Sequence, residues 1–326
     1  MRIAVISDMH VLGPGEAQRS HRIAHDLGAR HSFLARKWNR ALLRVRRRLW
    51  NWHPEFREAV FLRALDVIAE FRPDWIVANG DYGGDSSGVG LSDDESFESV
   101  RRVLDLMRST FPDHCRFVFG DHELGKHSTE LRRGGIRYES LQRGETALGL
   151  RIFWHEQDGA FHLIGLASTL LTLDLFLPEA LPGEIPRWLE RREELIGRLR
   201  ETFAALPSDA RILLFLHDPS ALGALEEIPE VRARLPQIER TVLGHLHAPG
   251  LLPLVGLLAR LPRLNPRYPV ARIIAHGARG AHRWPAFRPV VCPAVFGAGH
   301  HFSGGLLFLE TDAGGRLHVR RHRLPG

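Results

Sequence analysis

Short apolar runs punctuate the chain, and each is followed directly by polar residues or glycine. Such runs are typical of buried strands. They cover residues 3–6, 75–78, 117–119, 212–216 and 242–243. Longer segments repeat apolar side chains every three or four residues, which is the spacing of one helix face. They predict helices over residues 55–71, 96–108 and 186–206. Strands that alternate with helices predict an α/β fold.

Three further apolar runs, at residues 161–167, 289–295 and 305–310, add strands to this prediction. The last of them and residues 317–320 flank Ala313-Gly314-Gly315, which is a turn sequence and predicts a β-hairpin. The length of 326 residues suits one large domain with insertions, so we expect residues 1–326 to form a single domain.

Residues 29–52 stand apart from the alternating pattern as the first predicted insertion. Their apolar side chains recur at helical spacing, and arginines and Lys37 occupy the remaining faces, so the segment predicts a basic amphipathic helix. It could dock on an anionic membrane surface with its tryptophans at the interface. It could equally pack over the domain as a cap, with solvated arginines. The cap is favoured because amphipathic helices of globular proteins usually bury their apolar face.

Residues 249–271 form the second predicted insertion and are strongly apolar, with seven leucine and valine residues between positions 251 and 261. They suit an interfacial hairpin or the wall of an acyl-chain pocket. The simpler interpretation, a buried helix over a sheet edge, is favoured. Together the two insertions keep a lipid-linked substrate and peripheral contact with the inner face of the membrane as open alternatives.

The net charge of +6 attracts anionic partners without identifying them. Nucleic acid is disfavoured as a partner, because the aromatic residues of 29–52 lie on the apolar face rather than among the arginines, which is poor for base stacking.

Cys115 occurs beside a predicted strand and Cys292 within one, so we expect two core thiols. A strand begins at Arg2 and leaves no room for a signal peptide, and no apolar segment reaches the length of a membrane span. We therefore expect a cytoplasmic protein.

Five of the predicted strands are followed by potential metal ligands. These are Asp8 and His10, then Asp81, then Asp121 with His122 and Glu123, then His217, and finally His245 and His247. The carboxyl ends of strands in open α/β sheets are where binding sites are built, so we expect these side chains to meet at one rim. Carboxylates and imidazoles are the ligands of a pair of divalent metal ions, and they suit Mn, Fe and Zn alike.

The ordered set Asp8-Met9-His10, Gly80-Asp81, Gly120-Asp121-His122-Glu123, His217 and Gly244-His245-Leu246-His247 resembles the pattern of the calcineurin-like metallophosphoesterases. The resemblance implies a four-layer α/β/β/α sandwich, here with helical insertions. It implies that one ion is held by Asp8, His10, Asp81 and His247, and a second by Asp81, Asp121, His217 and His245. Asp81 would bridge the two ions, which need shared anionic charge because they repel each other.

The resemblance also implies hydrolysis of a phosphate ester by a hydroxide that bridges the two ions. His122 would serve as the general acid at the leaving oxygen, or stabilise charge on the phosphoryl group. Glu123 would orient a neighbouring histidine. The sequence leaves open a phosphomonoester, a phosphodiester or a pyrophosphate bond, on a lipid-linked substrate or a soluble nucleotide. A non-catalytic scaffold on the same fold is the alternative from another functional class.

Two features qualify this picture. The family pattern has Asn where this chain has Asp121, and the added negative charge would tighten metal binding and attract an anionic substrate less. A degenerate site is the competing interpretation of that change.

The loop of residues 126–137 carries cations and a Gly-Gly pair, which suits a clamp on the substrate phosphate as well as a solvated surface loop. The clamp residues would be Lys126, Arg132, Arg133 and Arg137.

Overall fold

The structure is a computed structural model that describes residues 1–19, 54–126, 133–245, 282–296 and 304–324. Both predicted insertions, residues 29–52 and 249–271, lie outside the described residues, as do Arg132 and His247. The two interpretations of each insertion, and the assignment of residues 1–326 to one domain, therefore stay predictions.

The first of two five-stranded sheets contains the first and the last strand of the described residues. Its order is β10-β9-β1-β2-β3, with β1 (Arg2–Ile6), β2 (Trp75–Ala78), β3 (Cys115–Phe117), β9 (Gly305–Thr311) and β10 (Leu317–Arg323). Strands β1, β2 and β3 are parallel, whereas β9 runs antiparallel to β1 and pairs with β10 as a hairpin. The predicted hairpin is thus confirmed.

The second sheet has the order β4-β5-β6-β7-β8. It consists of β4 (Phe153–Asp158), β5 (Phe161–Leu166), β6 (Arg211–Leu216), β7 (Ile238–Leu243) and β8 (Pro289–Val291). Strands β5 to β8 are parallel and β4 is antiparallel to β5. The sequence did not predict β4, because its polar second half gives no apolar run.

Alternate residues of the strands point to opposite faces, and this divides the core in two. Ile3 and Val5 of β1 belong to the cluster between the sheets, with Leu213 and Phe215 of β6. Their neighbours in sequence, such as Ala4, belong to the larger cluster under the helices. Both faces of the central strands, such as β5 and β6, are therefore covered, as expected for parallel strands. The two cysteines are free thiols, as predicted, and Cys292 is buried between the sheets.

Helices form the two outer layers. The long ones are α3 (Pro54–Phe71), α4 (Asp94–Thr110), α6 (Tyr138–Leu148) and α9 (Ile185–Ala205). The short α-helices are α5 (Asp121–Leu124), α7 (Ser168–Leu171), α8 (Leu173–Phe176), α10 (Ala221–Glu227) and α11 (Pro229–Ala233). Single 3-10 turns are η1 (Gly90–Ser92), η2 (Leu177–Glu179), η3 (Pro182–Glu184), η4 (Leu235–Gln237) and η5 (Trp284–Phe287).

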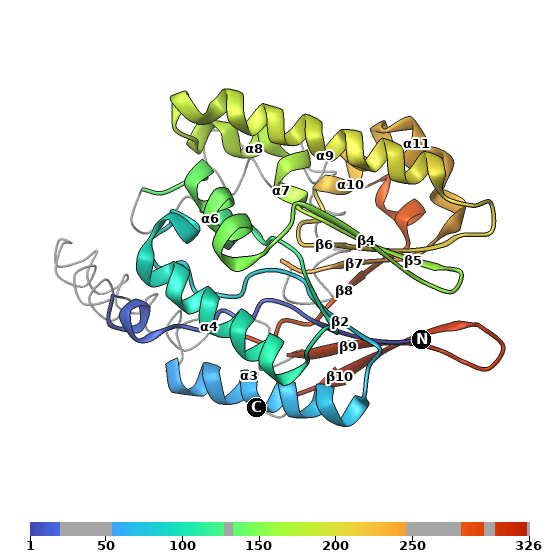
Figure 1. Cartoon of the computed structure of the whole chain (residues 1–326), viewed down its shortest axis with the longest axis horizontal. Helices are drawn as coiled ribbons and strands as arrows, with labels where there is room; N and C mark the ends of the chain where they lie inside the picture. The colour runs from blue at the N-terminus through green and yellow to red at the C-terminus, as the bar shows by residue number, and fades with distance from the viewer. Residues whose placement is uncertain (20–53, 127–132, 246–281, 297–303, 325–326) are drawn as a thin grey trace, which may run out of the picture.

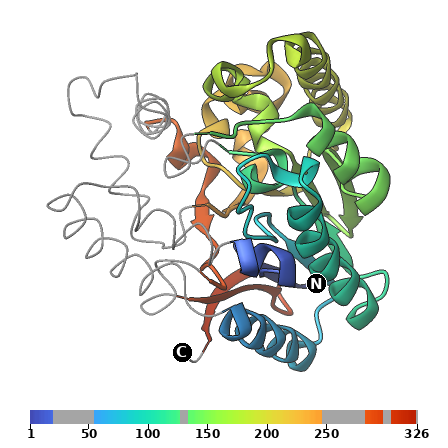
Figure 2. The same cartoon turned by 90° about the vertical axis from the view of Figure 1, so that its left-hand side faces the viewer.

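Figure 1 shows α3 and α4 beside the first sheet and α9 with its shorter neighbours over the second. The turned view in Figure 2 again places blue α3 at the bottom and the yellow helices at the top. The predicted four-layer α/β/β/α sandwich is therefore confirmed. Helix α9 follows its sequence pattern, since Trp188, Leu195, Leu199 and Phe203 form its buried stripe. Asp93 caps α4 by accepting a hydrogen bond from the Ser96 amide, which explains where that helix begins.

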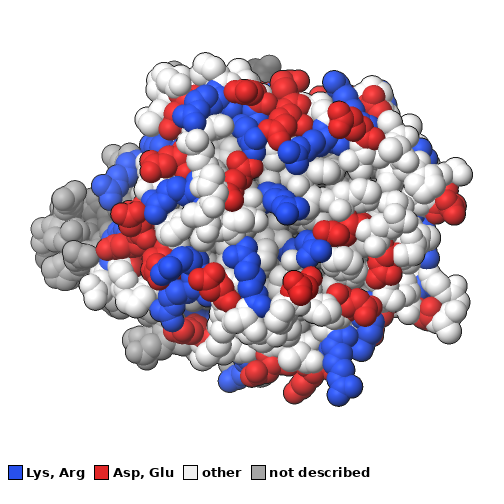
Figure 3. Space-filling view, viewed as in Figure 1, with Lys and Arg blue, Asp and Glu red and all other residues white. Residues whose placement is uncertain are grey.

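Charges on the outer surface are mixed in sign. On the face shown in Figure 3, Lys and Arg side chains lie interspersed with Asp and Glu. Several arginines form ion pairs with acidic neighbours on adjacent elements, such as Arg102 with Glu58 and Arg143 with Asp94. Within the described part of the chain, no helix has the length and apolar character needed to cross a membrane.

Candidate metal centre

The loops after β1 and β2 are joined by main-chain hydrogen bonds. The amide of Asp8 donates to Gly80 O, and the amides of Met9 and His10 both donate to Asp81 O, at 2.9–3.1 Å. Parallel pairing of the two strands delivers the two loops side by side. Asp8, His10 and Asp81 therefore reach one rim of the sheet, as the sequence predicted.

Four of the predicted ligands have left-handed backbone conformations. The φ angles are 54° at Asp8, 46° at His10, 57° at Asp81 and 58° at His245. Residues other than glycine seldom adopt this region, and each such residue costs folding free energy unless its surroundings fix it. Because four such residues lie at one rim, we infer that the placement of their side chains, rather than the lowest backbone energy, determines the conformation of these turns.

Two glycines of the motifs are required for steric reasons. Gly80 has φ +90°, and a Cβ atom there would lie 2.7 Å from Gly120 Cα and 2.7 Å from His217 Nδ1. A Cβ atom on Gly120 would lie 2.3 Å from Asp81 Oδ1. No side chain fits at such distances. The loops after β2 and β3 consequently approach each other as closely as main chains can.

Asp81 is at the centre of the candidate site. Its Oδ2 atom lies 3.1 Å from His217 Nε2, 3.8 Å from His122 Nε2 and 3.9 Å from His10 Nε2. Its Oδ1 atom accepts a hydrogen bond from the His122 amide at 3.1 Å. Asp81 is 1 % exposed. One carboxylate oxygen is thus held by main chain while the other faces three imidazoles from different loops.

Asp121, His217 and His245 complete a second group around Asp81. The ligand atoms of these four residues all lie within 4.8 Å of one another. Asp121 Oδ1 is 3.5 Å from His217 Nε2 and 3.4 Å from His245 Nδ1. These four residues are the set that the family resemblance implies for the second ion. A further group, His10, Asp81 and His122, lies beside it.

Main-chain carbonyls orient two of the histidines. His217 Nδ1 lies 2.8 Å from Asn79 O, and His10 Nδ1 lies 3.3 Å from Gly83 O. A ring nitrogen that donates to a carbonyl leaves the other nitrogen with its lone pair free for a metal ion. In both residues the Nε2 atom faces the carboxylates of the site.

Among the described residues, Glu123 forms hydrogen bonds with main chain and none with a histidine, so its predicted role of orienting a histidine stays a prediction. Its carboxylate accepts hydrogen bonds from three main-chain amides, those of Asp81 at 3.0 Å, Tyr82 at 2.9 Å and Gly120 at 2.8 Å. It therefore ties the loop after β2 to the loop after β3. Burial, with a smaller contribution from Asp81, raises the pKa of the Glu123 carboxyl to about 7.

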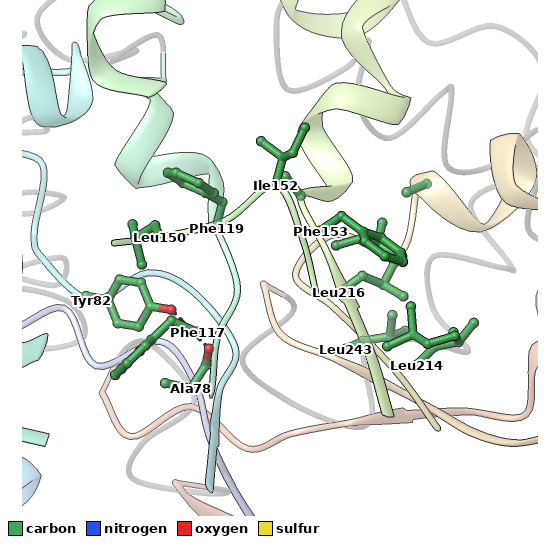
Figure 4. Packing of buried hydrophobic residues seen from close by; sticks show 14 of the residues in the cluster. Ala78, Tyr82, Phe117, Phe119, Leu150, Ile152, Phe153, Leu214, Leu216 and Leu243 are labelled. Carbon is green, nitrogen blue, oxygen red and sulfur yellow. Dashed lines mark hydrogen bonds between the residues drawn. The ribbon is translucent and has the colours of Figure 1, made fainter. Parts of the chain in front are cut away.

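Tyr82 anchors the loop after β2 to the ends of β2 and β3. Its hydroxyl lies 2.7 Å from Val118 O and 3.0 Å from Ala78 O, so it bridges the ends of the two strands. Figure 4 shows its ring turned toward Ala78 and Phe117 among buried side chains. The residue next to Asp81 in sequence is thus part of the core, which fixes the position of the carboxylate.

The buried carboxylates and imidazoles of the site stabilise one another's charged forms. Burial opposes ionisation of Asp81, but His217 and His122 outweigh burial and hold the pKa of its carboxyl well below the ordinary value. Burial likewise opposes protonation of His217, yet Asp81 and Asp121 raise the pKa of its imidazole. These groups compensate one another within the chain, and a divalent cation would take the place of the imidazolium protons.

The described residues of the site fit a metal centre. Asp121 Oδ1 is buried and has no hydrogen-bond donor among the described residues, and it faces two imidazoles. Buried carboxylates that converge on imidazoles are the donor set of divalent metals. The first predicted ion can be followed only in part, because His247 lies outside the described residues. Asp8 Oδ1 is 4.0 Å from His10 Nε2.

The residues predicted to form a phosphate clamp have different surroundings in the structure. Lys126 Nζ lies 2.6 Å from Asp121 Oδ2, inside the candidate site. The Arg137 guanidinium donates to the main-chain oxygens of Ile136 and Glu179, so it holds its own loop in place. Arg133 is exposed. The clamp stays a prediction.

Sequence reasoning missed two supporting residues. Asn79 precedes the Gly-Asp motif, and its Nδ2 atom donates to Leu216 O at 3.0 Å and lies 3.4 Å from Val242 O. Arg57 of α3 is buried and donates to His10 O at 3.0 Å. Asn79 is a buried polar residue at a strand end, which is a signal that could have been used. Arg57 lies far away in sequence and gives no such signal.

Comparison with known proteins agrees with this geometry. The family model for calcineurin-like phosphoesterases matches residues 1–249. No curated protein matches the sequence. Among solved structures, a dimetal phosphatase from Danio rerio is similar in fold, with a TM-score of 0.51 and 14% identity, over 99% of this chain and 96% of that one. A phosphopantetheinyl hydrolase from Mycobacterium tuberculosis aligns with a TM-score of 0.35 and 17% identity, over 76% of this chain and 83% of that one. The chain belongs to the calcineurin-like phosphoesterase family and is a metal-dependent phosphoester hydrolase.

Proposed function

We propose that the chain hydrolyses a phosphate ester at a centre of two divalent ions that share Asp81. The observation that carries this proposal is the position of Asp81 Oδ2, within 4 Å of His10, His122 and His217. Asp8, His10 and His247 would complete the first ion's ligands, and Asp121, His217 and His245 those of the second. Two such ions would lower the pKa of a shared water enough to supply hydroxide near neutral pH.

His122 would act on the substrate rather than as a permanent ligand. Its side chain is 24% exposed, whereas those of Asp81 and His217 are nearly inaccessible. Its ring centroid lies 4.9 Å from that of His10, at the open edge of the centre. A histidine in that position can donate a proton to the leaving oxygen or stabilise phosphoryl charge.

The experiment that tests this function compares initial rates with p-nitrophenyl phosphate and bis-p-nitrophenyl phosphate in the presence of Mn²⁺, Fe²⁺ or Zn²⁺. The wild-type chain should hydrolyse at least one of the two esters. Asp81→Ala should lose activity, whereas His122→Ala should lower kcat and retain metal. Metal binding without hydrolysis of these esters, nucleotides or lipid pyrophosphates would favour the non-catalytic scaffold.

The substrate class rests on residues outside the described structure. The basic amphipathic pattern of residues 29–52 supports a lipid-linked ester at an anionic surface, and soluble nucleotides remain the alternative. Sedimentation with vesicles of anionic or zwitterionic lipid separates these two proposals. Binding to anionic vesicles that weakens at high salt would support the lipid-linked substrate. No binding at low salt would favour the nucleotide.

A further inference from the structure

The two oxygens of the Asp121 carboxylate face different partners. Oδ1 points to the imidazoles, 3.5 Å from His217 Nε2 and 3.4 Å from His245 Nδ1. Oδ2 is 2.6 Å from the ammonium of Lys126. Asp121 is 1% exposed and the Lys126 side chain 33%. The carboxylate thus offers one oxygen to the candidate metal centre and the other to the Lys126 ammonium.

The local fold brings Lys126 to this position. Helix α5 begins at Asp121 and ends at Leu124, and Gly125 follows with φ +98°. A Cβ atom at Gly125 would lie 2.5 Å from Gly135 O, so only glycine permits this turn. The turn reverses the chain and returns Lys126 to the start of the same short helix.

The ion pair as a whole has the net charge of a neutral ligand. An asparagine at position 121 would present one oxygen to the metal centre and an amide group on the other side. Aspartate presents a second oxygen there, and the ammonium of Lys126 meets it. Two divalent ions with the carboxylates of Asp8, Asp81 and Asp121 carry a charge of about +1, and Lys126 restores about +2.

We propose that Lys126 is a positioning and charge-compensating partner of Asp121, and that the two residues together act as one neutral metal ligand. This inference rests on the proposed dimetal centre. It assigns Lys126 to the centre rather than to the substrate phosphate. It also explains how an aspartate at position 121 is compatible with an active site, against the interpretation of a degenerate one.

The proposal predicts opposite effects for the two single substitutions. Lys126→Met makes the centre more negative, so Mn²⁺ should bind about tenfold more tightly and the acid limb of the pH–rate profile should move to higher pH. Asp121→Asn leaves Lys126 uncompensated, so Mn²⁺ should bind about tenfold more weakly and the limb should move to lower pH. The double variant Asp121→Asn/Lys126→Met should return to within about threefold of the wild-type dissociation constant.

Calorimetric titration with Mn²⁺ on folded, metal-free protein gives the decisive readout, because it does not depend on turnover. Lys126→Arg keeps the charge and should bind Mn²⁺ like the wild type. Arg116→Met is the matched control, since Arg116 and Glu156 form an ion pair of the same 2.6 Å length away from the centre. It should leave the dissociation constant unchanged.

Several results would overturn the proposal. One is a shift of both single variants in the same direction, and another is a double variant no closer to the wild type than Asp121→Asn. A raised KM in Lys126→Met with an unchanged Mn²⁺ dissociation constant would show that Lys126 binds the substrate phosphate, as the clamp prediction states. If Lys126→Met does not fold, the double variant must still bind Mn²⁺ more tightly than Asp121→Asn. A wild-type chain that binds no metal would instead refute the proposed function.

Discussion

The Nδ1 atom of His217 lies 2.8 Å from the carbonyl oxygen of Asn79, while its Nε2 atom lies 3.1 Å from Asp81 Oδ2. The side chain of Asn79 in turn reaches the carbonyl oxygens of Leu216 and Val242, near the ends of β6 and β7. One residue at the end of β2 therefore fixes a histidine of the opposite sheet through its main chain, and the two sheets through its side chain. The candidate centre depends on the relative position of both sheets.

Replacement of Asn79 tests this link. Asn79→Ala removes the hydrogen bonds to the second sheet and should lower the free energy of unfolding by about 1–3 kcal/mol, with weaker Mn²⁺ binding. Asn79→Asp should be worse, because a carboxylate oxygen would face carbonyl oxygens. Urea unfolding and Mn²⁺ titration measure both effects. Gln157→Ala, which removes an exposed amide that donates to Gly159 O, is the control. If the Asn79→Asp variant is as stable as the wild type, Asn79 does not link the two sheets in this way.

Gly80 tests the close approach of the two motif loops. In Gly80→Ala the added Cβ atom would meet Gly120 and His217 at 2.7 Å and would also occupy a left-handed backbone conformation. We expect loss of Mn²⁺ binding and a lower unfolding midpoint. Gly197→Ala is the matched control, because Gly197 lies within α9 and a Cβ atom there meets nothing within 4 Å. That variant should be as stable as the wild type or more so. Equal metal affinity in both variants would show that the loops can separate without consequence.

Glu123 tests the main-chain clamp between the same loops. Glu123→Gln replaces one accepting oxygen by an amide group, which would face a main-chain N–H donor. The expected loss is about 1–3 kcal/mol in the free energy of unfolding, together with weaker Mn²⁺ binding. Glu98→Gln removes a carboxylate from an exposed ion pair with Arg101 and should change stability by less than about 1 kcal/mol. Similar small losses in the two variants would mean that the clamp does not organise the centre.

Asp85 provides a test based on pH. Burial, partly opposed by His122, raises the pKa of its carboxyl to about 6, while Oδ1 accepts hydrogen bonds from Ser87 Oγ and from the Gly88 and Gly90 amides. The folded chain binds this proton more tightly than the unfolded chain, so the free energy of unfolding falls as pH rises from about 4 to about 6. An asparagine accepts the same bonds and does not titrate.

The stability of Asp85→Asn relative to the wild type should therefore rise between pH 4 and pH 6 and remain level above pH 7. We expect a total change of about 1–3 kcal/mol. Urea midpoints of both proteins across this range measure the difference and cancel the contributions of other groups. A difference independent of pH would show that Asp85 ionises in the folded chain as freely as in the unfolded one.

The sequence predicted the strands and the rim of the site because both follow local rules. Apolar runs identified β1, β2, β6 and β9, whereas the grouping of Asp81, Asp121, His217 and His245 was implied by the family resemblance. Strand β4 was not predicted, because it lies at the edge of its sheet and its second half is polar.

The contact partners of Lys126, Asn79 and Glu123 were not predicted, for a different reason. Glu123 depends on the approach of the loops after β2 and β3, Lys126 on the turn at Gly125, and Asn79 on the packing of the two sheets, and no sequence pattern states these contacts. Lys126 could serve a phosphate clamp or a metal centre on sequence alone, and only its distance to Asp121 separates the two.

Metal content is the most direct test of the dimetal centre. After equilibration with Mn²⁺ and removal of free ions, elemental mass spectrometry should find about two ions per wild-type chain. Asp81→Ala should lose most of them because both ions share this carboxylate, whereas Asp105→Ala, at an exposed position of α4, should retain about two. A wild-type chain with almost no bound metal, or an Asp81→Ala chain with an unchanged content, would contradict the account.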